Sequence, residues 1–295
     1  AARSAPIPVV ILCGPTAVGK TSLIGSLGEG RYEIVSADSR QVYRYLDIGT
    51  AKPSRETLEQ VPHHLIDVCD PSEQYTSGRF VRDADRAVRR ITDRGRFAVV
   101  SGGTGYYIRH FLFGLPEGPG SFPEIRAELK REMDLHGVDA MYRMLAEVDP
   151  VTANRISPKD RYRVERALEV YRGTGRRLSD FRVPAEPRTC YRTLTLMIDR
   201  PRSELYERID RRVELMFDEG LQYELERVLQ MGFGEDAPGL SSIGYAELLS
   251  MRRSGCRTLS QIRETIKRNT RRYAKRQITF FKRLPGLVRL EADDA

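Results

Sequence analysis

The sequence predicts an α/β protein with a parallel-sheet core and an inserted all-helical domain. Short β-branched runs alternate with amphipathic helical segments in the first third of the chain, which is typical of a parallel sheet covered by helices on both faces. A stretch rich in Pro and Gly follows at 114–124, and from there to Gly175 only helical patterns occur. Strand and helix patterns then resume. We therefore expect a core formed by residues 1–114 and 190–295, with a helical domain at 115–189.

Local patterns predict the individual elements in chain order. Runs of apolar, β-branched residues predict strands at 8–13, 32–38, 63–68 and 193–199, and another that begins at 96 and meets a glycine-rich turn at 101–104. Apolar residues at helical spacing predict helices at 78–95, 123–137, 138–150, 158–175 and 202–221, and the fourth of these ends at Gly173 or Gly175. A helix is also expected over 22–28, and only further helices are expected between 221 and the C-terminus.

The stretch GPTAVGKT, between the first strand and the first helix, matches the phosphate-binding motif G-x-x-x-x-G-K-[ST]. Backbone N–H groups of such a loop surround phosphate oxygens, its lysine adds positive charge, and its threonine hydroxyl can ligate Mg²⁺. Because a strand precedes the motif and a helix follows it, the core is predicted to be P-loop NTPase-like. The residues expected to bind phosphate or diphosphate are Gly14, Pro15, Thr16, Ala17, Val18, Gly19, Lys20 and Thr21.

Positive charge is concentrated near the C-terminus. The segment 267–283 contains eight Lys and Arg residues and no acidic residue, so it accounts for the whole formal net charge of +8. Basic pairs recur at roughly one-turn spacing, which on a helix gives a single stripe. Such a stripe suits the backbone of a nucleic acid, and an ordinary solvated helix face has the same pattern.

Composition argues against several other classes of protein. No apolar run reaches the ~18 residues of a membrane span, and the short apolar run before the loop lacks the features of a signal peptide, so no membrane partner is expected. The four cysteines are scattered, with no CxxC pair. Their spacing argues against a disulfide framework or a zinc site and favours a reducing, cytoplasmic location.

Asp38, at the expected end of the second strand, is the first candidate catalytic residue. The strand that begins at 96 ends in Ser101-Gly102-Gly103-Thr104, with no carboxylate to serve the metal of an ATPase. Asp38 can therefore serve a metal, activate an acceptor, or only cap a helix. The residues alone leave open a P-loop kinase that phosphorylates a small-molecule or nucleotide acceptor, and a transferase whose leaving group is diphosphate. A non-enzymatic RNA-binding protein is a third possibility.

Five segments together resemble the bacterial tRNA dimethylallyltransferases. In chain order they are GPTAVGKT, VSADSRQVYRYLDIGTAKP, HHLIDVCDP, GGTGYY and AKRQITFF, and the resemblance runs from Val10 to about Phe281. It implies transfer of a dimethylallyl group from dimethylallyl diphosphate to tRNA, with release of diphosphate. The implied acceptor is the N6 amine of the adenosine 3′-adjacent to the anticodon in tRNAs that read codons starting with U. The loop would then bind a departing diphosphate, and no phosphoryl group would move.

The same resemblance implies catalytic roles for three residues. Asp38 would accept a hydrogen bond from N6 and take its proton, and Thr104 would contact the reacting adenosine. Arg212 would stabilise the charge that develops on the diphosphate, together with Mg²⁺ held at Thr21. Without the resemblance, Thr104 would be a turn hydroxyl that caps the next helix, and Arg212 an ordinary exposed residue of a helix.

For tRNA, the resemblance implies contacts from both the core and the inserted domain, and this domain would clasp the anticodon stem. The implied contact residues are Asp38, Ser39, Arg40, Gln41, Thr104, Arg126, Tyr162, Arg163, Arg166, Gly244, Tyr245, Lys275, Arg276, Gln277 and Lys282. The expected partners are the anticodon stem-loop of tRNA and dimethylallyl diphosphate. We expect a monomer with no obligate protein partner.

Overall fold

The computed structural model describes residues 5–26, 30–255 and 258–292. The chain divides into two compact units. One unit comprises Ala1–Gly114 and Arg188–Ala295, and the other comprises Leu115–Pro187. No helix in the described part of the chain combines the length and the apolar composition that crossing a membrane requires.

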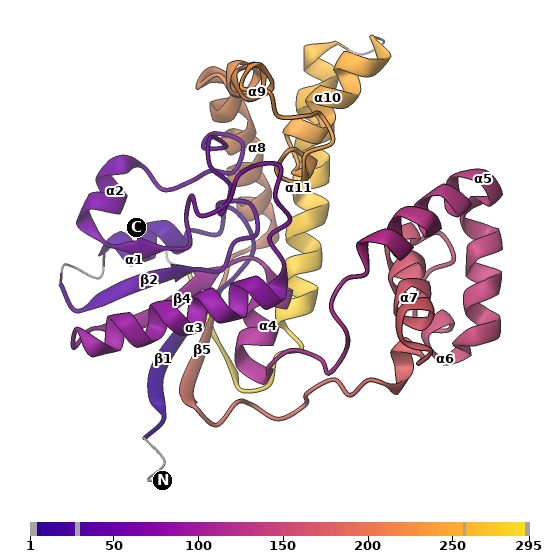
Figure 1. Ribbon diagram of the computed structural model, residues 1–295. Helices are drawn as coiled ribbons and strands as arrows, with labels where there is room; N and C mark the ends of the chain where they lie inside the picture. The colour runs from indigo at the N-terminus through magenta and orange to yellow at the C-terminus, as the bar shows by residue number, and fades with distance from the viewer. Residues whose placement is uncertain (1–4, 27–29, 256–257, 293–295) are drawn as a thin grey trace. The chain divides into compact units, whose positions relative to one another are not determined.

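The first unit is built on a sheet in which all neighbouring strands are parallel (Figure 1). Within the described residues, its strands are β1 (Ile7–Cys13), β2 (Tyr32–Ser36), β3 (His63–His64), β4 (Phe97–Gly102), β5 (Tyr191–Asp199) and β6 (Leu287–Glu291). Their order across the sheet is β3-β2-β4-β1-β5-β6. The predicted α/β class with a parallel sheet is confirmed.

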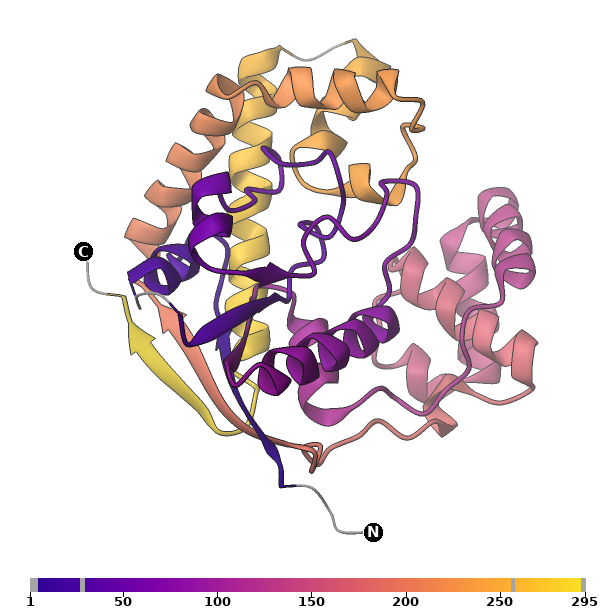
Figure 2. The same ribbon diagram turned by 60° about the vertical axis from the view of Figure 1, so that its left-hand side comes forward.

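Helices of the first unit cover both faces of this sheet (Figures 1 and 2). The helices of this unit are α1 (Lys20–Ser26), α2 (Arg55–Gln60), α3 (Ser77–Asp93), α4 (Gly105–Phe113), α8 (Arg202–Asp218), α9 (Leu221–Gln230), α10 (Tyr245–Ser254) and α11 (Leu259–Phe281), with a 3₁₀ turn η2 (Pro238–Ser241). Successive residues of β1 point to opposite faces. Ile11 and Cys13 therefore join the cluster formed with α3 and α4, whereas Leu12 joins the one formed with α1 and α8.

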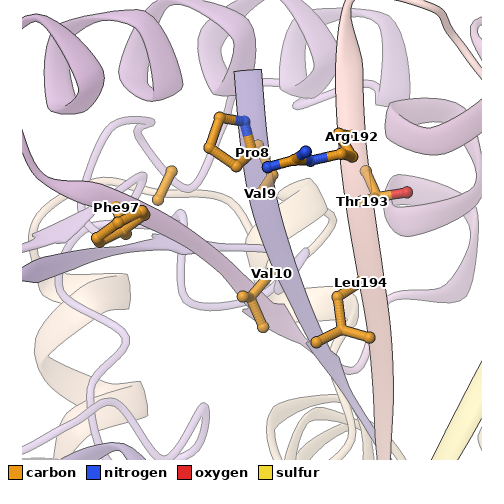
Figure 3. Close-up of a pocket in the computed structure, with 8 residues that line it drawn as sticks. Pro8, Val9, Val10, Phe97, Arg192, Thr193 and Leu194 are labelled. Atoms are coloured by element: carbon orange, nitrogen blue, oxygen red, sulfur yellow. The ribbon is translucent and has the colours of Figure 1, made fainter. Parts of the chain in front are cut away.

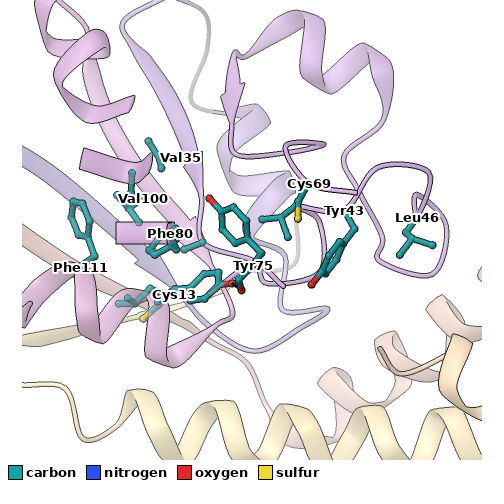
Figure 4. Close-up of a cluster of buried hydrophobic side chains, with 14 of the residues drawn as sticks. Cys13, Val35, Tyr43, Leu46, Cys69, Tyr75, Phe80, Val100 and Phe111 are labelled. Atoms are coloured by element: carbon teal, nitrogen blue, oxygen red, sulfur yellow. Dashed lines mark hydrogen bonds between the residues drawn. The ribbon is translucent and has the colours of Figure 1, made fainter. Parts of the chain in front are cut away.

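The larger of these two clusters reaches beyond the sheet (Figure 4). Phe80 of α3 and Phe111 of α4 are fully buried within it. It continues to Tyr43 and Leu46, in the loop that follows β2, and these side chains are also buried. The loop that begins with Asp38 is therefore fixed to the hydrophobic core.

Two of the predicted strands are shorter than expected. β2 ends at Ser36, two residues before Asp38, and only His63 and His64 of the predicted third strand pair with β2. Leu65 and Asp67 have φ angles of 66° and 55°. This left-handed backbone cannot continue a ladder, so β3 stops there.

The expectation that only helices follow residue 221 is wrong, because β6 lies at the end of the described chain. β6 pairs in parallel with β5 and forms the edge of the sheet. Most of its residues are exposed or half-buried, so its apolar pattern is too weak to signal a strand without its partner. The predicted helix at 22–28 corresponds to α1, and residues 27 and 28 lie outside the described residues.

The second unit is helical, as predicted. Its elements are α5 (Pro123–Val148), α6 (Pro150–Ala153), α7 (Arg161–Thr174) and the 3₁₀ turn η1 (Leu178–Asp180). Gly137 has φ 78° and ψ 162°, which breaks α5 where the sequence predicted the end of one helix and the start of another. Gly175 adopts the left-handed conformation that ends α7. Leu129, Met141 and Leu168 are among the residues of a separate core in this unit.

Candidate active site

The candidate residues of the first unit follow strands that are neighbours in the sheet. The phosphate-binding loop follows β1, Asp38 follows β2, and Thr104 follows β4. Because β2, β4 and β1 are adjacent and parallel, these segments meet at one edge, where ligands of open α/β sheets bind. Arg212 reaches the same place from α8.

The phosphate-binding loop has a backbone that depends on glycine at both ends. Gly14 has φ 153° and Gly19 has φ 110°, and a Cβ at Gly14 would lie 3.0 Å from the carbonyl oxygen of Ile198. At Gly14 the loop therefore lies directly against β5 and leaves no room for a side chain, whereas at Gly19 a side chain would be strained by the positive φ.

Lys20 extends back across this loop. Its Nζ donates hydrogen bonds to the carbonyl oxygens of Gly14 and Pro15, both at 2.9 Å. Burial lowers the pKa of Lys20 to about 8, and the negative charge of Asp38 partly opposes that change. The lysine is thus a half-buried cation at the centre of the loop, where an anion would be held.

The lowered pKa of Lys20 predicts that anion binding depends on pH. Lys20 is protonated below about pH 8 and neutral above it, so affinity for a diphosphate should fall as the pH rises through that value. We expect the Kd of an alkyl diphosphate, already fully ionised near pH 7, to rise up to about tenfold per pH unit above the pKa of Lys20. Isothermal titration at constant ionic strength measures this change.

A Lys20→Arg variant, which stays charged, should give a flatter profile of Kd against pH. A flat wild-type profile between about pH 7 and pH 9.5 would contradict the assignment.

Three arginines at β5 and α8 donate hydrogen bonds to the same loop. Arg212 Nη1 lies 3.3 Å from Thr16 Oγ1, and Arg208 Nε lies 2.9 Å from the carbonyl oxygen of Ala17. Arg200 Nε lies 3.4 Å from the carbonyl oxygen of Val18. Burial lowers the pKa of Arg212, as does the charge of Arg208, whereas Asp38 raises it. Arg212 is therefore not the ordinary exposed residue of the alternative reading.

Arg200 and Arg208 were not among the residues predicted from the sequence. Two signals were available. Arg208 lies four residues before Arg212, which places both on one face of α8. Arg200 directly follows β5, the strand next to β1, so it lies at the same edge of the sheet.

Asp38 is held by the turn that it begins. Its Oδ1 accepts hydrogen bonds from the backbone N–H groups of Arg40, at 2.8 Å, and Gln41, at 3.3 Å. Asp38 caps this turn and not a helix. Within the described residues, Asp38 Oδ2 accepts no hydrogen bond, so this carboxylate oxygen is left to act on a ligand.

Thr104 connects the turn after β4 to the turn after β2. Its Oγ1 accepts a hydrogen bond from the N–H of Ser39 at 2.9 Å and lies 3.2 Å from Ser39 Oγ. Thr104 is the N-cap residue of α4, but its hydroxyl makes no capping bond to that helix, so the alternative of a capping hydroxyl is wrong. Thr104 therefore lies next to Asp38.

The basic stripe of α11 is only partly available to a ligand. Lys267 pairs with Glu214 at 2.7 Å and Arg271 pairs with Asp210 at 2.6 Å, and both acids belong to α8, which runs beside α11 in Figures 1 and 2. The other six basic residues of this segment are exposed. They are Arg268, Arg272, Lys275, Arg276, Lys282 and Arg283.

Three residues for which the resemblance implied tRNA contacts are buried, namely Gly244, Tyr245 and Gln277. Tyr245 is fully buried, and its hydroxyl donates to Glu224 and accepts from the N–H of Gly49 at 3.1 Å. Gln277 is 6% exposed and bonds to the phosphate-binding loop. Gly244 directly precedes Tyr245 and is the N-cap residue of α10. Arg40 donates to Ser241 Oγ at 3.1 Å, and Gln41 donates to the carbonyl oxygen of Ala51 at 3.0 Å.

The remaining implied tRNA contacts belong to the second unit. Arg126 and Arg166 both pair with the buried Glu169, at 2.8 Å and 2.9 Å. Burial acts to raise the pKa of Glu169, but hydrogen bonds from Phe122 and the two arginines outweigh it and keep the pKa below its ordinary value. Tyr162 is 68% exposed, and Arg163 pairs with Asp160. This helical surface presents cations held in place by a buried carboxylate.

An apolar hollow of the first unit lies away from these residues (Figure 3). It is lined by Pro8, Val9, Val10, Phe97, Ala98, Arg192, Thr193 and Leu194. These residues begin β1, β4 and β5, whereas the phosphate-binding loop follows the other end of β1. Its lining is suited neither to a diphosphate nor to a base, so it is not the candidate active site.

Comparison with known proteins finds IPP transferases and tRNA dimethylallyltransferases. The model of the IPP transferase family matches residues 41–284. The chain is 47% identical over 287 residues to tRNA dimethylallyltransferase 1 of Syntrophotalea carbinolica, covering 97% of this chain and 91% of that protein. It is 43% identical over 288 residues to the tRNA dimethylallyltransferase of Geobacter sulfurreducens, covering 96% and 91%.

Two similar solved structures are also transferases of this kind, by their names. The tRNA isopentenylpyrophosphate transferase of Bacillus halodurans is 36% identical, with a TM-score of 0.68 and coverage of 96% of this chain and 89% of that one. A eukaryotic dimethylallyltransferase acting on tRNA is 29% identical, with a TM-score of 0.78 and coverage of 98% and 74%.

Proposed function

This chain belongs to the IPP transferase family, and we propose that it transfers a dimethylallyl group from dimethylallyl diphosphate to the N6 amine of an adenosine in tRNA. It is a prenyl transferase that acts on tRNA. We place the acceptor 3′-adjacent to the anticodon of tRNAs that read codons starting with U. The observation that carries the proposal is the meeting of the phosphate-binding loop, Asp38 and Thr104 at the ends of adjacent strands.

The loop side of the site is suited to a leaving diphosphate. Cleavage of the allylic C–O bond leaves the bonding electron pair on the diphosphate oxygen, so negative charge grows there. Lys20 and Arg212 provide positive charge at the loop, and both are already fixed by hydrogen bonds to it. Groups preorganised where charge develops stabilise the transition state more than the ground state.

The Asp38 side is suited to an adenine amine. The new bond joins N6 to the allylic carbon, and N6 must lose one proton as the diphosphate leaves. Asp38 Oδ2 can accept that proton, while the turn holds Oδ1 in place. An adenine amine is a weak nucleophile, so orientation by Asp38 and Thr104 contributes as much as proton removal. The base must leave the stack of the anticodon loop, at a cost of a few kcal/mol.

The residues at the loop fit a bound Mg²⁺. Thr21 places a hydroxyl in the first turn of α1, next to Lys20. No group of three or more acidic, His or Cys side chains suited to a metal occurs in the described ranges. Mg²⁺ commonly takes few protein ligands and is held mainly by substrate phosphates and water, so Thr21 is a sufficient protein ligand. Bound there, Mg²⁺ would supply further positive charge for the diphosphate.

The anticodon stem-loop is the proposed RNA partner of both units. In the first unit, exposed Lys275, Arg276 and Lys282 lie on α11 and at its end, and in the second unit Arg126 and Arg166 lie near exposed Tyr162. Cations contact phosphates, and an exposed tyrosine can stack on an unpaired base. We also propose that the enzyme acts as a monomer in the cytoplasm, since one chain supplies the loop, Asp38, Thr104 and Arg212.

Charge reversal on α11 tests the RNA contact. We expect Lys275→Glu/Arg276→Glu to weaken tRNA binding and to lower the slope of log K against log salt by about two, because two phosphate contacts are lost. Filter binding across a salt series measures both quantities. The matched control is Arg89→Glu/Arg90→Glu on α3, which changes two exposed arginines outside the proposed interface. An unchanged slope in the α11 variant would remove this helix from the interface.

Assays with two donors separate the proposed function from the kinase alternative, which the comparisons do not favour. The purified enzyme should consume dimethylallyl diphosphate only when tRNA is present, and it should not transfer the γ-phosphate of ATP to any acceptor. Turnover of ATP without prenyl transfer would favour the kinase. Binding of tRNA with neither activity would favour the non-enzymatic RNA-binding protein.

A further inference from the structure

Gln277 lies on the RNA-facing helix α11 but is directed into the protein. Its neighbours Lys275 and Arg276 are exposed, whereas Gln277 is 6% exposed. The side-chain Oε1 accepts a hydrogen bond from the backbone N–H of Thr16 at 2.9 Å. The side-chain Nε2 donates to the carbonyl oxygen of Gly103 at 2.8 Å. One amide therefore connects α11 to the phosphate-binding loop and to the turn after β4.

Both partners of Gln277 adjoin the candidate catalytic groups. Thr16 also accepts the hydrogen bond from Arg212, so the loop residue that Gln277 holds is the one that Arg212 touches. Gly103 directly precedes Thr104, which bonds to Ser39 beside Asp38. The diphosphate side and the adenosine side of the site are thus joined through a single side chain.

The surrounding backbone leaves room for this amide and for little else. A Cβ added to Gly103 would lie 2.3 Å from Gln277 Nε2, and its next contact would be the carbonyl oxygen of Gly14 at 3.5 Å. Glycine at position 103 therefore lets the Gln277 amide approach the backbone of residue 103. The oxygen and the nitrogen of the Gln277 amide each make a hydrogen bond within the protein, and the side chain is buried, so it is poorly placed to read an RNA base.

We propose that Gln277 is a positioning residue, which fixes the distance between the diphosphate loop and the Thr104 turn, and not a direct tRNA contact. The proposal rests on the proposed function of the site. A positioning role predicts that loss of the amide weakens donor binding and slows turnover, because Thr16 and Gly103 each lose a buried partner. It also predicts that affinity for tRNA stays the same, because the exposed cations of α11 are unchanged.

The test uses Gln277→Met, which keeps the size of the side chain but has neither amide group. We expect the Kd of dimethylallyl diphosphate, titrated without RNA, to rise about tenfold or more, and kcat to fall by a similar factor. The Kd of tRNA should stay within about twofold of wild type. A higher tRNA Kd with an unchanged donor Kd would overturn the proposal and make Gln277 an RNA contact.

The matched control is Asn269→Leu. Asn269 is another amide on α11, but it donates to Glu247 of α10 at 2.7 Å, away from the loop. Each variant loses an amide of the same helix, buried at Gln277 and half-buried at Asn269, and should lower Tm, whereas only Gln277→Met should alter donor binding. If both variants lower Tm and neither alters donor Kd, the role is merely structural and the proposal fails.

Gly103→Ala disrupts the contact between the Gln277 amide and the backbone of residue 103 without changing Gln277. Its Cβ would displace the Gln277 amide, so donor Kd should rise while tRNA Kd does not, even if Gln277→Met does not fold. An unchanged donor Kd in a folded Gly103→Ala protein would contradict the proposal. Donor binding is measured without an acceptor, so a wild-type enzyme that fails to prenylate tRNA would overturn the proposed function and leave this test valid.

Discussion

Replacing Asp38 with asparagine should lower kcat for prenyl transfer by about 10²- to 10⁴-fold and leave tRNA affinity nearly unchanged. The amide oxygen of asparagine can still accept the hydrogen bonds from the N–H groups of Arg40 and Gln41, so the turn should persist. The variant removes only the group that takes the N6 proton. Asp38→Ala removes the turn bonds as well and should lower kcat at least as far. Single-turnover kinetics with saturating tRNA measures the effect on the chemical step.

The matched control for this prediction is Asp47→Asn. Asp47 lies in the same loop and is exposed, and its carboxylate pairs with Lys52 at 2.7 Å, not with any proposed catalytic group. The control removes the same charge and should retain near wild-type turnover. If Asp38→Asn kept its turnover but lost tRNA binding, Asp38 would be a recognition residue and not the base.

Replacing Lys20 with methionine should reduce kcat/KM for dimethylallyl diphosphate by about 10²- to 10³-fold, the usual effect of removing one stabilising group from a developing anion. The side chain keeps most of its length and apolar contacts, so the loss reports the charge and its hydrogen bonds to Gly14 and Pro15. Steady-state kinetics with varied donor measures the change.

Lys20→Arg provides the comparison for that variant, since it restores a positive charge with a different shape. It should recover part of the activity that Lys20→Met loses, and tRNA Kd should be unchanged in both. Full activity of Lys20→Met would show that the loop does not bind the leaving diphosphate.

Local patterns predicted the parts of the fold that have strong periodicity. The break at Gly137, the stop at Gly175 and the parallel core were all predictable, because glycine geometry and helical spacing are local properties. The edge strand β6 and the early end of β3 were not predictable from local patterns. β6 depends on pairing with β5, far away in the sequence, and β3 ends because Leu65 adopts a left-handed conformation that its residue type does not favour.

For the candidate site, the motif and the resemblance identified residues but not their surroundings. The sequence pointed to Lys20 and Asp38, and the structure adds that the two charges influence each other. Helical spacing put Arg208 on the same face as Arg212, but the sequence could not indicate that Gln277 and Tyr245 are buried, since burial depends on contacts between distant segments. Burial is a property of the packed fold, so residues assigned to RNA by position in a motif can instead support the site.

The central claim is that the loop at Gly14–Thr21 holds the departing end of a prenyl donor while Asp38 faces the acceptor amine. The most direct measurement incubates the enzyme with dimethylallyl diphosphate, labelled in its prenyl group, and unmodified tRNA, and then analyses the nucleosides. The account predicts label on N6 of one adenosine, next to the anticodon, with one diphosphate released per label. Label elsewhere in the RNA, or none while ATP is consumed, would contradict it.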